Sequence, residues 1–482
     1  MAPSRYQRRT PETSVLYQVV ADHLETLLDD ARARSGHGFG LPRHVETEFR
    51  RYLACGQLAH GFGRARCTAC GLDRLVAFSC KGRALCPSCR GRRMVDVGAH
   101  LVDHVLPSAP YRQWTLTVPF ALRLAMARDR ALLSRVLGLF LRAVFVWQRA
   151  AARAAGLPDP RPGAVTAIQR FGSALNLNVH FHALIPDGVF VPAGPARLRF
   201  APLPRPTDAD VAWICDRVVR RVMAHLAADA DGRDDEPDAD TALLAESVRP
   251  AVRSPSASPT PPHRRHLTAS LDGFTVHADT DVGAADRAAL ERLVRDGARP
   301  PFAHQRLART RAGKIAYRLR RPWSGGQTEI VLEPVALLRR LAALIPPPRQ
   351  HQLRYHGVFA GRAADRAAIA QLVPPPDSPR ASAHHRPARP TTCSPPPHRL
   401  AARRLPWAEL FRRAFREDLL VCPRCEGPVE IIAALVDPAV TRRVLDHLGL
   451  AADPVAIAPA RGPPQHDLWP DGVEFDSADA PA

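Results

Sequence analysis

The sequence predicts an α+β protein with more than one structural unit, and three observations lead to this fold class. Six of the ten cysteines fall between Cys55 and Cys89, which marks a compact N-terminal region. Farther along, short apolar runs bounded by turn residues predict strands, and apolar residues at helical spacing predict helices between them. At 482 residues the chain has room for two or three domains and a large core.

The principal elements follow from these patterns. A first helix is expected from Ser14 to about Arg34, and Tyr111–Phe120 is expected to be the first strand of a second domain. A buried helix is expected over Ala131–Trp147. Two further strands are expected at Ala164–Phe171 and Asn176–Val191.

Composition shifts divide the chain into four parts. An acidic and then Ser/Pro-rich stretch predicts a disordered insertion in the central domain, and a proline-rich stretch predicts a linker. The expected parts are an N-terminal helix with a zinc-binding domain (1–105), a central domain (106–370, with the insertion at about 228–265), a linker (371–400) and a small C-terminal unit with its tail (401–482).

The charge balance points to a polyanionic partner. The formal net charge is +20, and Lys81 and Lys314 are the only lysines, so the positive charge is carried by arginine. The planar guanidinium fork binds phosphate well, which favours nucleic acid. No apolar signal segment is found in Met1–Thr10, and the most apolar helix contains Arg135 and Arg142, so we expect a soluble, cytoplasmic protein that does not span a membrane.

Two C-x-x-C pairs predict a structural zinc site. Cys67 and Cys70 are separated by fifteen residues from Cys86 and Cys89, a spacing typical of the two knuckles of a zinc ribbon. We therefore expect these four thiolates to bind one Zn²⁺.

Other potential zinc ligands are left over from this assignment. Cys55, His60 and Cys80 lie in the same block and could build a second site. Cys422 and Cys425 form only half of a site.

A pair of histidines marks a second candidate site. Asn178, His180 and His182 alternate with apolar residues in a predicted strand, so the two imidazoles are expected on one face. In that arrangement they can share one divalent cation. The alternative is a pair of hydrogen-bonded histidines with a structural role.

Several motifs together resemble a known family, the rolling-circle transposases of the insertion-sequence-91 type, including the 801/1294 relatives. The resemblance covers nearly the whole chain. Its motifs are FSCKGRALCPSCRGRRM (Phe78–Met94), HLVDHVLP (His100–Pro107), IQRFGSALNLNVHFHALIPDGVF (Ile168–Phe190), LIPPPR (Leu344–Arg349), RYHGVFA (Arg354–Ala360) and LLVCPRC (Leu419–Cys425).

The resemblance implies a fold and an activity. The cysteine block would be a zinc-binding domain, followed by an HUH endonuclease domain with a central antiparallel sheet and flanking helices. His180 and His182 would bind Mg²⁺ or Mn²⁺, and a tyrosine on a nearby helix would cleave and join DNA through a 5′-phosphotyrosine intermediate. The implied partner is DNA, single-stranded or hairpin in form at the ends of the element, and the implied location is the nucleoid.

The chain departs from the family at the nucleophile. In the family a tyrosine stands in a pattern similar to L-x-R-Y-x-x-R-P-P, and here Leu293–Pro301 has Asp296 at that position. Relatives with two tyrosines place the other four residues earlier, where this chain has Arg292. An active transposase and a catalytically impaired DNA-binding relative therefore both remain open, beside a nucleic-acid-associated zinc protein with no role in transposition. The third metal ligand also stays open, with Gln169, His277 and Glu291 as candidates.

Overall fold

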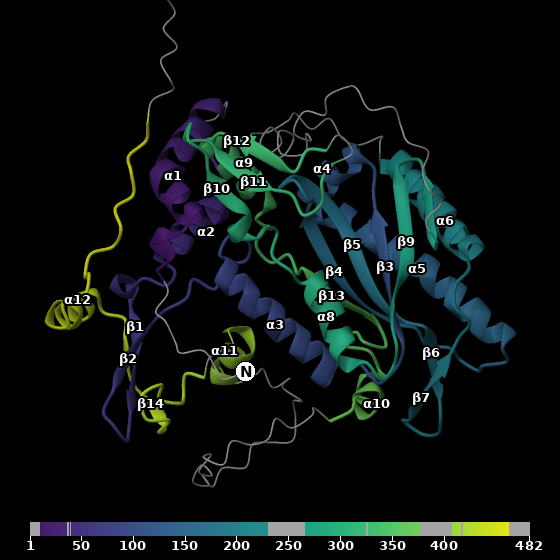
Figure 1. Ribbon diagram of the computed structural model, residues 1–482. Coiled ribbons are helices and arrows are strands. Elements are labelled where there is room, and N and C mark those ends of the chain that lie inside the picture. The colour runs from purple at the N-terminus through teal and green to yellow at the C-terminus, as the bar shows by residue number, and fades with distance from the viewer. Residues whose placement is uncertain are drawn as a thin grey trace, which may run out of the picture.

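The structure is a computed structural model that describes residues 10–461, apart from 36–37, 39, 230–265, 324–325, 376–406 and 416–417. Its helices and antiparallel sheets confirm the predicted α+β class (Figure 1). Nearly all of the predicted insertion at about 228–265, and of the predicted linker at 371–400, lies outside the described residues.

The centre of the molecule is a six-stranded sheet in which every neighbouring pair of strands is antiparallel. In spatial order its strands are β13 (Leu353–Gly357), β4 (Gly163–Phe171), β5 (Leu177–Pro186), β3 (Tyr111–Thr117), β9 (Phe274–Val282) and β8 (Thr268–Leu271). The predicted strands at Tyr111–Phe120 and Ala164–Phe171 are thus confirmed within a few residues.

The strand predicted at Asn176–Val191 is in fact two strands. It breaks at Asp187, beyond which β6 (Gly188–Pro192) leaves the central sheet and pairs with β7 (Leu198–Pro202). The carboxylate of Asp187 accepts hydrogen bonds of 2.9 and 2.8 Å from the guanidinium of the buried Arg112 on β3. This bidentate contact holds the turn in place. Because apolar residues continue on both sides of the turn, the sequence alone does not indicate the strand break.

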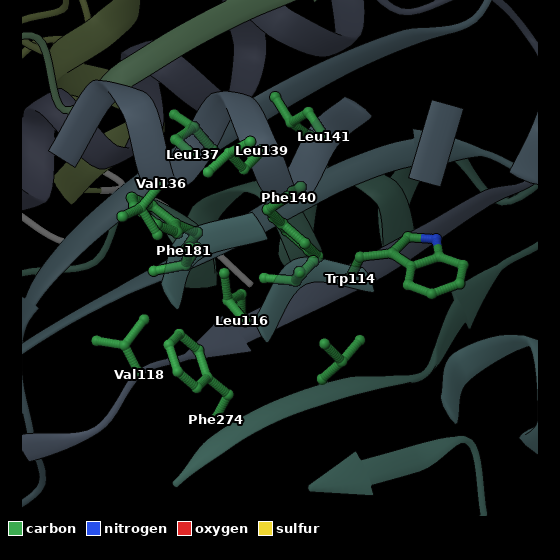
Figure 2. Close-up of a cluster of buried hydrophobic side chains, with 14 of the residues drawn as sticks. Trp114, Leu116, Val118, Val136, Leu137, Leu139, Phe140, Leu141, Phe181 and Phe274 are labelled. Atoms are coloured by element: carbon green, nitrogen blue, oxygen red, sulfur yellow. The ribbon is translucent and has the colours of Figure 1, made fainter. Parts of the chain in front are cut away.

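One face of the sheet carries the main hydrophobic core. Helices α4 (Phe120–Arg128), α5 (Arg130–Ala154) and α6 (Asp208–Asp229) cover it. Figure 2 shows Trp114 and Phe181 of the sheet among the α5 side chains. Within the described residues, α5 is the one helix long and apolar enough to cross a membrane, yet its apolar stripe is buried against this sheet.

The opposite face is covered only in part. Helices α3 (Pro87–His104) and α8 (Arg287–Gly297) lie side by side there (Figure 1). Their apolar residues pack on one end of the sheet, and the contacts include Leu101, Val102, Leu290 and Val294 from the helices and Val165 and Leu184 from the strands. Polar residues of the same face, among them Gln169 and His180, lie near the end of β4 and the start of β5.

The N-terminal helices pack with a distant part of the chain. Helix α1 (Val15–Arg34) confirms the first predicted helix, and with α2 (Arg43–Ala54) it shares a core with α9 (Pro334–Leu344). A small sheet belongs to the same core, made of β10 (Leu307–Arg309), β11 (Ile315–Arg318) and β12 (Glu329–Leu332).

The C-terminal segment completes a sheet of the cysteine block. Strand β14 (Val429–Leu435) pairs with β1 (Phe62–Cys67), which also pairs with β2 (Asp73–Ala77). The remaining helices are α10 (Arg366–Gln371), α11 (Trp407–Phe415) and α12 (Pro438–His447). The boundaries predicted for independently folding domains stay predictions, but the C-terminal unit is joined to the N-terminal sheet rather than separate from it.

The packing of Phe181 predicts a large effect on stability. Its ring is fully buried between β5 and the covering helices, so Phe181→Ala should lower the free energy of unfolding by about 3–5 kcal/mol. Val331→Ala, at a half-exposed position on β12, is the control and should change it by about 0.5 kcal/mol or less. Urea denaturation followed by circular dichroism measures both, and equal effects would contradict this placement of the core.

Candidate metal centres and histidine site

The histidine pair lies on the partly covered face of the central sheet. In the antiparallel register, His180 of β5 lies opposite Gln169 of β4 and Thr117 of β3. His182 lies opposite Ala167 and Thr115 in the same way. Because directly opposed residues point to the same side of a sheet, these side chains form a small polar surface around the two imidazoles.

The pair is held in the chemical state that metal binding requires. The ring centroids are 4.9 Å apart. Burial lowers the pKa of His180 to about 4 and that of His182 to about 3, so both rings are neutral at pH 7. Since a neutral imidazole has one free nitrogen lone pair, each ring can act as a ligand.

The hydrogen bonds leave suitable nitrogen atoms free. Nδ1 of His180 donates to the carbonyl oxygen of Asn178 at 2.8 Å, which leaves Nε2 as the unprotonated nitrogen. Nδ1 of His182 lies 3.3 Å from the Thr115 hydroxyl, and its Nε2 is buried with no hydrogen-bond partner among the described residues. A buried ring nitrogen without a partner fits a divalent cation at this point.

Of the three candidates for the third metal ligand, Gln169 is the one directly opposite a histidine of the pair in the strand register. Its side-chain NH₂ donates to the carbonyl oxygens of Asp296 and Gly297, both at 3.0 Å, and its Oε1 atom is buried without a partner among the described residues. His277 is opposite Thr115, one strand farther from the pair. Glu291 instead forms an ion pair of 2.6 Å with Arg295 on α8.

Asp296 stands where α8 meets the sheet. It is the second-last residue of α8, and its carbonyl oxygen accepts the hydrogen bond from Gln169, the residue opposite His180. Its carboxylate is about half exposed and lies 3.7 Å from Nε of Arg299. The end of the helix expected to carry the nucleophile is therefore next to the histidine pair.

The described tyrosines lie elsewhere. Tyr17, Tyr52 and Tyr317 belong to the core of the N-terminal helices. Tyr111 is buried and donates to the carbonyl oxygen of Pro107. Tyr355, on the edge strand β13, is opposite Val165 and packs with the apolar residues below α3 and α8.

The cysteines form two clusters, and this corrects the predicted grouping. The expected single site of Cys67, Cys70, Cys86 and Cys89 is wrong, because the two C-x-x-C pairs belong to different tetrads. The observed tetrads are Cys55, Cys80, Cys86 and Cys89, and Cys67, Cys70, Cys422 and Cys425. Local geometry explains the difference: Cys67 ends β1 at the turn of the β1–β2 hairpin, whereas Cys86 caps the start of α3 beyond the other end of β2.

Both tetrads have the dimensions of a zinc site. In the first, the Sγ atom of Cys55 lies 3.5 Å from that of Cys86, and the Sγ atoms of Cys80 and Cys89 are 3.5 Å apart. Four thiolates at about 2.3 Å from a tetrahedral Zn²⁺ are separated by about 3.8 Å. Four ligand atoms within 4.8 Å of one another satisfy this requirement in each cluster.

The second tetrad joins the two ends of the chain. Cys67 lies 3.5 Å from Cys425, and Cys70 lies 3.6 Å from Cys422, measured between sulfur atoms. The half-site at Cys422 and Cys425 thus finds its other half across the β1–β14 pairing. The C-x-x-C spacing of Cys422 and Cys425 was the one feature of the sequence that indicated a metal ligand pair there. His60 belongs to neither tetrad.

Comparison with known proteins gives two family matches. Residues 23–118 match the family described as "Transposase zinc-binding domain", and residues 163–367 match the family described as "Putative transposase". The first tetrad lies within the former match and the histidine pair within the latter. No curated protein and no solved structure matched the chain.

The two tetrads predict two Zn²⁺ ions in each purified chain. Cys425→Ser should remove one zinc ion and leave the other, because it breaks only the second tetrad. Cys215→Ala, at a buried cysteine outside both tetrads, is the control and should keep both. Elemental analysis by mass spectrometry measures the ratio, and a single zinc ion in the unchanged protein would contradict the two-site assignment.

Proposed function

We propose that this protein, a transposase of the insertion-sequence-91 type as the two matched domains indicate, binds single-stranded DNA at the ends of its element at a cation-bearing HUH site. The observation that supports this most is the neutral histidine pair among polar side chains on one face of an antiparallel sheet, next to the end of α8. The site would act on the cytoplasmic, nucleoid-associated DNA that carries the element.

His180 and His182 would hold Mg²⁺ or Mn²⁺ through Nε2, with Oε1 of Gln169 as the third protein ligand. The fit rests on two buried atoms that have no hydrogen-bond partner among the described residues, Nε2 of His182 and Oε1 of Gln169. When bound, such a cation polarises a phosphodiester and offsets charge in the transition state. The protein's own contribution is to keep both imidazoles neutral and to orient them through Asn178 and Thr115.

The family's rolling-circle chemistry needs a tyrosine next to the pair, and the part of the chain that the structure describes has none at position 296. A phenol attacks phosphorus, the bond to the 3′-oxygen breaks, and the energy of the phosphodiester is kept in the 5′-phosphotyrosine. Asp296 would instead give an acyl phosphate, which hydrolyses readily and stores a DNA end poorly.

A second candidate function follows from Asp296. The chain would then be a catalytically impaired relative that recognises element ends and binds a cation but does not form the covalent intermediate. This alternative is favoured by the carboxylate at position 296, near the end of α8, and by the burial of four of the five described tyrosines in other cores. The fifth, Tyr355, is partly buried on β13.

Replacing Asp296 separates the two candidates. The unchanged protein should bind single-stranded DNA from the element ends without forming an adduct that survives denaturation. Asp296→Tyr should form such an adduct in Mn²⁺, because its side-chain position is partly exposed and tolerates the larger ring. A labelled oligonucleotide and a denaturing gel measure this.

Two controls make the result specific. Asp296→Phe adds the same ring without the hydroxyl and should form no adduct. Asp296→Tyr combined with His182→Ala should lose the adduct, because the cation site is broken. If the unchanged protein forms a stable adduct, the impaired alternative is wrong; if Asp296→Tyr binds DNA and Mn²⁺ without forming one, the assignment of position 296 is wrong.

A further inference from the structure

A cavity lined by positively charged side chains lies next to the histidine site. Its volume is about 400 Å³, and it lies between the start of α3, the end of α8 and the segment that leads into β13. No carboxylate lines it. Five arginines do: Arg83, Arg90, Arg93, Arg299 and Arg349.

Arg90 is buried in this wall with neutral partners only. Its guanidinium donates to Oε1 of Gln352 at 3.1 Å and to the carbonyl oxygens of Ala298 and Arg299 at 3.2 and 3.1 Å. Its Nε has no partner among the described residues, and no described carboxylate lies within ion-pair distance. A buried cation without a counter-charge is costly, and an anion in the cavity would offset that cost.

Arg83, a second arginine of the cavity, also has only neutral hydrogen-bond partners for its guanidinium. Its guanidinium donates to the carbonyl oxygens of Pro347 and Gln350. Burial and the charge of Arg93 lower the pKa of Arg83. Glu48, the carboxylate next to it in the fold, is already used by the backbone N–H groups of the Arg83 segment, at 2.6 Å from that of Arg83 itself.

Arg349 is held in a strained backbone conformation at the same cavity. Its φ is +60°, in the left-handed region that residues with a Cβ seldom adopt. Its side chain is exposed rather than packed in a core. Backbone strain of this kind is concentrated at ligand sites, where it fixes the direction of a side chain.

The cavity borders the histidine site. Gln169 lines it and lies opposite His180 in the sheet. Arg299 also lines it, and its guanidinium lies 5.3 Å from the ring centroid of Phe171, at the end of the same strand as Gln169. A strand of DNA bound at the pair would therefore extend towards the arginines.

We propose that this cavity binds a backbone phosphate of single-stranded DNA, the phosphodiester next to the one at the histidine pair. The identification of the ligand as DNA rests on the proposed function; the anion-binding character rests on the five arginines. Guanidinium groups bind phosphate oxygens in bidentate pairs. The arginines come from α3 and the segment before it, from the residues just beyond α8 and from the α9–β13 segment, so the bound strand would contact all of these parts.

The test removes one exposed arginine of the cavity without weakening the fold. Arg349→Gly deletes the charge and relieves the left-handed strain, so the melting temperature should not fall. Binding of a fluorescein-labelled oligothymidylate should weaken, and the slope of log K against log salt should decrease by about 0.7, as for one lost phosphate contact with a single strand. Arg93→Gln, an exposed cavity residue on α3, should have the same effect.

The control is Arg311→Gly, which removes an equally exposed arginine from the β10–β11 turn, outside the cavity, and should leave the slope unchanged. If Arg349→Gly and Arg93→Gln behave like this control, the cavity proposal is overturned. The covalent-adduct assay reports separately on the proposed function. An adduct with unchanged slopes would overturn the cavity alone, whereas altered slopes without any adduct in Asp296→Tyr would support the cavity and count against the proposed chemistry.

Discussion

The pairing of β5 with β4 and β3 is the constraint on which the rest of the site depends. Side chains alternate along a strand, so a slip of one residue would turn His180 and His182 into the core. Burial of Phe181 and its apolar neighbours against α5 prevents such a slip. The same register sets Gln169 opposite His180. The hydrophobic core on one face thus fixes the polar site on the other.

The cysteine block is connected to the histidine site through α3. The first tetrad includes Cys86 and Cys89 at the start of that helix. The next residue, Arg90, donates to the carbonyl oxygens just beyond α8, where a cation complements the helix dipole. Gln169 binds the last carbonyl oxygens of α8 from the sheet side. The end of α8 is therefore held from both sides, and the tetrad acts as a support for the site as well as for its own loop.

Local patterns predicted much of the fold and of the site. Alternation placed both histidines on one face, and periodicity located α1 and the strands β3 and β4. What the sequence could not supply was long-range pairing. The fifteen residues between the two C-x-x-C pairs imitate a single zinc site, because spacing does not reveal that β1 and β2 carry Cys67 and Cys70 away from α3. The return of Cys422 and Cys425 to β1, and the break at Asp187 held by Arg112, likewise depend on contacts distant in sequence.

We propose that the histidine pair is a divalent-cation site rather than a structural pair. Electron spin-echo spectroscopy of the zinc-loaded protein with Mn²⁺ tests it directly, since imidazole nitrogens bound to Mn²⁺ modulate the echo. We expect a nitrogen modulation in the unchanged protein that is lost in the double variant His180→Ala, His182→Ala, while both zinc ions remain. Mn²⁺ bound without nitrogen modulation, or modulation that survives in the double variant, would contradict it.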